Sequence, residues 1–80
     1  MENIDKYNRV FCEIFNVSLE LLGDNFSSEN VDNWDSILQL SLVTQIEDSF
    51  DIMLDPEDII EFKSYTAGKR IAMKYGVEFL

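Results

Sequence analysis

The spacing of apolar residues is the feature that most constrains the fold of this chain. Apolar side chains recur every three or four residues in several segments, which is the period of a helix that buries one face. The longest such segment runs from Ser36 to Phe50 without glycine or proline, and at 1.5 Å per residue it predicts a helix about 22 Å long. No two alternating segments are joined by hairpin residues. The sequence therefore predicts an all-α fold.

Four helices follow from this spacing. The first is expected over residues 3–17, and a long polar connection follows it. The second is expected over Ser36–Phe50, with an inward stripe formed by Ile37, Leu40, Val43, Ile46 and Phe50 and widened by Leu38 and Leu42. Asp55 and Pro56 are typical of a helix start, so a short third helix is expected to run to about Phe62.

The fourth helix is expected to begin after a cap at Ser64 or Thr66 and to end at Gly76. Its inward stripe is Gly68, Ile71, Ala72 and Tyr75. The long connection is expected to be pinned to the core by Leu19, Leu21, Leu22, Phe26, Val31 and Trp34. Residues 51–54 are interpreted as an extended link, and Met53 and Met73 as core fillers.

The chain is strongly and unevenly acidic. Its 80 residues, interpreted as one domain over residues 1–80, carry a formal net charge of −10. Residues 10–62 hold thirteen Asp and Glu and no Lys or Arg. This balance argues against binding to nucleic acids or anionic membranes, which need basic surface. It favours a monomer that meets basic protein partners.

Cysteine usage and the first residues bear on location. Cys12 is the single cysteine, which excludes an internal disulfide and fits a reducing compartment. It is interpreted as a buried, inert thiol. The first residues lack the basic start and apolar stretch of a secretory signal, and no apolar run approaches a membrane span. A cytoplasmic location is therefore expected.

The residue types present exclude most catalytic chemistry. The chain has no histidine, which excludes Ser-His and Cys-His catalysis and any metal site that contains histidine. A calcium loop starting at Asp51 would place Met53, Pro56 and Phe62 at three essential positions, so the match fails. The acidic pairs Glu47-Asp48 and Glu57-Asp58 are interpreted as solvated faces. We therefore expect neither an enzyme nor a metal protein.

Ser36 has two interpretations. In any protein, an Asp-Ser pair before an apolar run is most simply a helix cap. The alternative is an exposed serine that is modified and presented to other proteins. No histidine is present to activate its hydroxyl, so a catalytic role is excluded.

The order of motifs decides between these interpretations. Asp35-Ser36-Ile37 heads the second expected helix, the run from Ile46 to Phe50 ends it, and Ser64 to Gly68 opens the last one. Over nearly the whole chain this arrangement resembles the acyl carrier protein family. The resemblance implies a four-helix bundle with a long loop between the first two helices and a short third helix. It also implies a 4′-phosphopantetheine arm on Ser36, beside Asp35, that carries acyl groups as thioesters.

The resemblance also implies the partners of the chain. These are a phosphopantetheinyl transferase and acyl-loading and acyl-using enzymes with basic docking surfaces. The partner-facing residues would be Ile37, Leu38, Glu47, Asp48 and Asp51, although Leu38 also fits a core position.

The chain departs from the family's pattern at two places. Asn33-Trp34 replaces the family's Gly-Leu, and the first half of the second helix carries Leu38, Gln39 and Ser41 where many members have acids. These departures favour a stand-alone carrier for a dedicated biosynthetic pathway, such as one that makes lipids or polyketides. Two alternatives stay open: an aminoacyl or peptidyl carrier, and an acidic interaction module without the arm.

Overall fold

The fold is formed by four α-helices and one short 3-10 helix. The computed structural model describes residues 2–79. Its elements are α1 (Asn3–Phe15), η1 (Leu19–Leu21), α2 (Ser36–Phe50), α3 (Pro56–Glu61) and α4 (Tyr65–Lys74). Within this part of the chain the only β pairing is one isolated bridge, between Ser27 and Ser64. The all-α prediction is confirmed.

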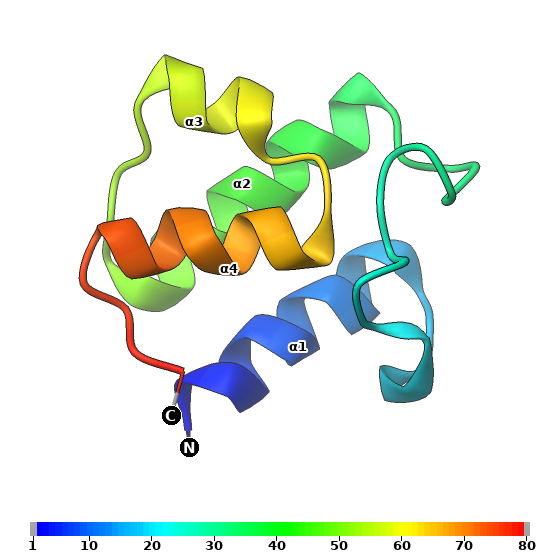
Figure 1. Cartoon of the computed structure of the whole chain (residues 1–80), viewed down its shortest axis with the longest axis horizontal. Coiled ribbons are helices and arrows are strands. Elements are labelled where there is room, and N and C mark those ends of the chain that lie inside the picture. The colour runs from blue at the N-terminus through cyan, green and yellow to red at the C-terminus, as the bar shows by residue number, and fades with distance from the viewer. Residues whose placement is uncertain (1, 80) are drawn as a thin grey trace.

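The helices lie in an arrangement that brings the first and last described residues together. In Figure 1, α4 crosses between α1 and α3 with α2 behind it, and the first and last described residues lie side by side. Asn3 Nδ2 donates to the carbonyl oxygen of Glu78 at 2.9 Å. The long connection between α1 and α2 runs along one side of the bundle.

Local backbone chemistry sets the helix ends. α1 ends at Phe15, two residues before its predicted end, because Asn16 adopts a left-handed conformation with φ of 55°. Asp51 ends α2 in the same way with φ of 54°. Asn and Asp tolerate this conformation better than most residues. At the start of α4 the cap is Ser64 and not Thr66, since Ser64 Oγ accepts a hydrogen bond from the amide of Ala67.

The core is dominated by aromatic side chains. Phe11 is fully buried at its centre. The rings with centroids 4.9 to 6.3 Å from that of Phe11 belong to Tyr7, Phe15, Phe26, Trp34, Phe62 and Tyr65. Most of these pairs are tilted or edge-to-face, the arrangement that the charge distribution of aromatic rings prefers. Residues from α1, the long connection and α4 thus share one core.

The long connection is anchored at fewer points than predicted. Phe26 and Trp34 are buried and Leu22 and Val31 are partly buried against the core, as expected. Two backbone hydrogen bonds fix the loop further, from the Ser28 amide to Lys63 and from the Tyr65 amide to Phe26, both 2.8 Å long.

The prediction for two loop leucines and for both methionines is wrong. Leu19 and Leu21 are exposed because no residue of η1 faces the core, and Leu22 after it packs against the core instead. Met53 is 82% exposed and Met73 is also exposed. The chain buries their neighbours Leu54 and Ala72 instead. Cys12 is only half-buried, because it borders the core-facing stripe of α1.

The predicted inward stripe of α2 is also wrong in its first half. Ile37 and Leu40 are 76% and 59% exposed, and Leu42, Val43 and Ile46 are buried. Successive residues are rotated by roughly 100° about the helix axis. A line of residues spaced three apart therefore moves gradually around the helix. Ile37 and Ile46 consequently lie on opposite faces, and an apolar surface is left exposed near Ser36.

Candidate functional site

Ser36 is the first residue of α2, and its side chain is exposed. The residue that caps the helix is Asp35, whose Oδ1 accepts a hydrogen bond from the Leu38 amide at 2.8 Å. The carbonyl oxygen of Asp35 accepts the first helical bond, from the Gln39 amide at 2.9 Å. The interpretation of Ser36 as a cap is therefore wrong, and its hydroxyl is not needed to begin the helix.

Ser36 lies between a helix N-terminus and a carboxylate. A helix N-terminus carries amides without helical partners and a partial positive charge, both of which favour a phosphate group. Asp35 is the neighbouring carboxylate, and one of its oxygens is already bonded to the Leu38 amide. The chain has no histidine, so no imidazole within it can activate the Ser36 hydroxyl.

Two hydrogen bonds made by Gln39 link Trp34, in the segment before Ser36, to α3. Trp34 Nε1 donates to Gln39 Oε1 at 3.3 Å, and Gln39 Nε2 donates to the carbonyl oxygen of Ile59 at 2.7 Å. Gln39 thereby fastens the first turn of α2 to the last turn of α3. The sequence contains one indication of this contact. Gln39 is a polar residue one helical turn before Leu42 and Val43, which are buried, so it lies on the core-facing side of α2.

The predicted partner-facing residues divide into two groups. Ile37, Asp48 and Asp51 are exposed. Leu38 instead packs against the core cluster and is partly buried. Glu47 is half-buried, and its Oε2 accepts a hydrogen bond from the Leu54 amide at 2.8 Å. Leu38 and Glu47 thus make structural contacts, and only the first group is freely presented.

Three large apolar residues of α2 and α3 are exposed. They are Ile37, Leu40 and Ile60, and each is at least 59% exposed. Leu40 and Ile60 directly follow Gln39 and Ile59, the two residues joined by the hydrogen bond between the helices. We call these three residues the α2–α3 patch. Exposed acids on the same helices include Asp48, Glu57 and Glu61.

Asp58 is a buried acid that the sequence interpretation placed on a solvated face. It is 6% exposed, and its Oδ1 lies 2.5 Å from Lys74 Nζ. Its Oδ2 accepts a hydrogen bond from the Tyr75 hydroxyl, which itself accepts one from the Asp55 amide at 3.1 Å. The hydrogen bonds from Lys74 and Tyr75 lower the pKa of Asp58, and the Asp58 carboxylate raises the pKa of Lys74.

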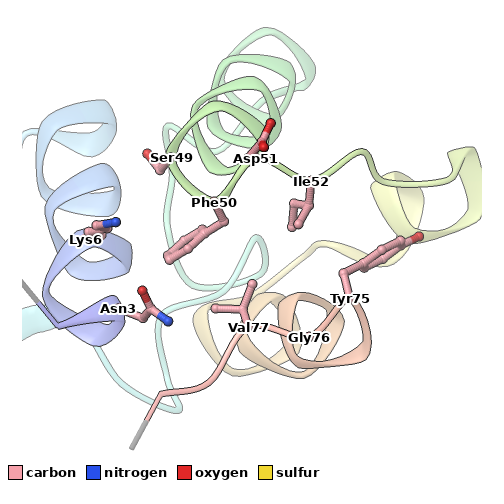
Figure 2. A pocket seen from close by; sticks show the side chains of 9 residues that line it. All are labelled: Asn3, Lys6, Ser49, Phe50, Asp51, Ile52, Tyr75, Gly76 and Val77. Atoms are coloured by element: carbon pink, nitrogen blue, oxygen red, sulfur yellow. The ribbon is translucent and has the colours of Figure 1, made fainter.

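A surface hollow of about 370 Å³ lies at the other end of α2. Figure 2 shows Lys6 and Asn3 on its α1 side, Phe50 at the end of α2, and Val77 from the segment after α4. The residues that line it are polar and apolar, and none of them belongs to the Ser36 region. Among residues 2–79, no three acidic or cysteine side chains converge to hold a metal ion. No helix within that range is both long and apolar enough to cross a bilayer.

No protein-family model matches this chain, and no curated protein matches its sequence. Function is therefore inferred from the residues and contacts of the chain itself.

Proposed function

We propose that this protein is an acyl carrier protein. It holds acyl groups as thioesters on a 4′-phosphopantetheine arm attached to Ser36 and presents them to the enzymes of a dedicated biosynthetic pathway. The observation that carries the proposal is the division of roles between two adjacent residues. Asp35 begins α2, and Ser36 beside it is exposed and can be modified without loss of the helix cap.

The site favours the phosphate of the arm. The amides of Ser36 and Ile37 stand ahead of the first helical hydrogen bond, which the Gln39 amide makes to Asp35. These amides can donate hydrogen bonds to the oxygens of a phosphodiester. The partial positive charge of the helix end stabilises the negative charge of that group further. The Ser36 hydroxyl attacks the phosphorus of coenzyme A that bears the pantetheine, the pyrophosphate bond breaks, and adenosine 3′,5′-bisphosphate leaves. The phosphopantetheinyl transferase supplies the base that takes the hydroxyl proton.

The surface near Ser36 supports docking to partner enzymes. The α2–α3 patch offers apolar contact close to the arm, and the exposed acids Asp48 and Asp51 lie at the distal end of α2. Apolar contacts at the centre of an interface slow dissociation, and charges at its rim accelerate association. A partner with a basic rim around an apolar centre therefore fits this surface.

Intact mass after co-expression with a phosphopantetheinyl transferase tests the proposal. The expected result is a mass increase of one arm, located on the peptide that contains Ser36. Ser36→Ala should abolish the increase. Ser18→Ala is a matched control, because Ser18 is also exposed and also lies at the start of a helical turn, and it should leave modification unchanged.

Two outcomes point elsewhere. Modification on a serine other than Ser36 contradicts the proposed site. An unmodified protein favours the acidic interaction module, which needs no arm. Loading the modified protein with acyl or aminoacyl groups by candidate enzymes then separates a carrier of acyl groups from one of aminoacyl or peptidyl groups.

A further inference from the structure

α3 differs from the other helices in what it buries. Its six residues include one buried side chain, and that side chain is the carboxylate of Asp58. A helix is usually held to its protein by an apolar face. Here the buried apolar anchors stand outside the helix, with Leu54 before it at 5% exposure and Phe62 after it at 0%.

Two sets of polar contacts hold α3 between those anchors. The first joins Asp58 to Lys74 and Tyr75 in and just after α4. The second is the hydrogen bond from Gln39 in α2 to the carbonyl oxygen of Ile59. The apolar contribution from within α3 is limited to Ile59, which is half-buried, since Ile60 points to solvent.

The contacts of Asp58 depend on one another. A buried carboxylate depends on every partner that it has, because loss of one partner leaves charge that water cannot solvate. Lys74 Nζ also lies 5.6 Å from the Tyr75 ring centroid, so the three side chains form one cluster. Loss of one member therefore weakens the attachment of α3 while the aromatic core around Phe11 is left untouched.

We propose that α3 detaches from the rest of the fold as a unit while α1, α2 and α4 stay folded, and that the contacts of Asp58 hold it in place. We call this mobile helix the lid. Leu54 and Phe62 remain in the core and mark the two ends of the moving segment. Local opening of this type is expected where few apolar contacts hold an element. Undocking breaks the hydrogen bond between Gln39 and Ile59, so the three residues of the α2–α3 patch keep their relative positions only when the lid is closed. Undocking itself does not depend on Ser36, whereas the role of the patch rests on the proposed function.

Amide hydrogen exchange, followed by NMR on the full chain, tests the lid. Asp58→Asn and the milder Tyr75→Phe should accelerate exchange of the Ile59 amide, which donates to Asp55 within α3, by roughly tenfold or more. Amides in the middle of α2 should keep their rates. Glu57→Gln is the matched control, since Glu57 is an exposed acid next to Asp58, and it should change neither set.

The indole N–H of Trp34 is a second reporter. It is the single tryptophan in the chain, and it reaches Ile59 through Gln39. Its NMR signal should shift in Asp58→Asn and Tyr75→Phe and stay in place in Glu57→Gln. Equal acceleration of exchange in α1, α2 and α3 would show that Asp58 stabilises the whole fold, and no acceleration would show that it does not hold α3. Either result overturns the proposal.

The Ser36→Ala background separates this proposal from the proposed function. There the arm cannot be attached, yet the effect of Asp58→Asn on the Ile59 amide should be the same. A lid that fails this test leaves attachment at Ser36 unaffected, and a Ser36 that is never modified leaves the lid unaffected.

Discussion

The hydroxyl of Tyr7 donates to the carbonyl oxygen of Tyr65 at 2.6 Å, and this buried bond joins α1 to the start of α4. Burial, and to a lesser extent the neighbouring Tyr65, raises the pKa of Tyr7 well above its ordinary value. Tyr7→Phe keeps the ring and leaves the carbonyl oxygen without this partner. We expect it to lower the free energy of unfolding by about 1–3 kcal/mol, measured by urea denaturation. An unchanged unfolding midpoint would contradict a role for this bond.

Gly68 lies against the side chains of Tyr7 and Phe62, next to that hydrogen bond. A Cβ at this position would collide with the Tyr7 hydroxyl and the Phe62 ring. Gly68→Ala should destabilise the protein by about 1–3 kcal/mol through overpacking, although alanine is the better helix former. Gly23→Ala is the control because its Cβ would meet open space, and it should be close to neutral. Thermal unfolding of the two variants compares them directly.

Asp35 and Ser36 should separate stability from modification. Asp35→Ala removes the cap of α2 and should cost about 0.5–2 kcal/mol in urea denaturation. Ser36→Ala should change stability by less than about 0.5 kcal/mol and should abolish attachment of the arm. A larger stability loss in Ser36→Ala than in Asp35→Ala would reverse the roles assigned to the two residues.

Docking should respond differently to apolar and charged substitutions. Leu40→Ala should speed dissociation from a partner enzyme without changing the salt dependence of binding, whereas Asp48→Lys should slow association and flatten that dependence. Surface plasmon resonance at several salt concentrations measures both rates. Leu38→Ala is the structural control: it should lower stability by about 2 kcal/mol because Leu38 packs on the core. If Leu38→Ala weakened docking without a loss of stability, Leu38 would belong to the interface.

The Asp58 cluster predicts a dependence of stability on pH. Its partners lower the pKa of Asp58 from 3.8, so its contribution is fully present above that value and is lost as pH falls through the lower folded pKa. The raised pKa of Lys74 gives a contribution that is present below 10.5 and is lost as pH rises beyond it. The difference in melting temperature between wild type and Asp58→Asn should therefore be constant from about pH 5 to pH 9 and shrink outside that range. A difference that does not vary with pH would exclude the charged pair as its source.

Local signals made the helix positions predictable. α2 has its predicted bounds because an Asp cap precedes it and no glycine or proline interrupts Ser36–Phe50. α3 and α4 begin where Asp55-Pro56 and Ser64 predict. Each of these signals acts within a few residues, so the sequence contains the information in plain form.

The contacts between helices were not predictable in the same way. Asp58 is buried because Lys74 and Tyr75, 16 and 17 residues later, reach it from α4. Gln39 faces inward because the carbonyl oxygen of Ile59, twenty residues away, accepts its hydrogen bond. Such pairings depend on how helices cross, which a helical period does not specify. The exposure of Ser36 follows from its helix position, but the patch beside it became visible only with the packing.

The contact between Asn3 and Glu78 has a consequence for how this fold can be used. Because these two residues are hydrogen-bonded, a short linker joining them would let new termini be opened in an exposed turn such as the one at Asp24 and Asn25. The permuted chain keeps every helix and the whole aromatic core. For the same reason the domain can be inserted into a surface loop of a host protein. The two connections to the host chain would then lie close together and would not separate the ends of that loop.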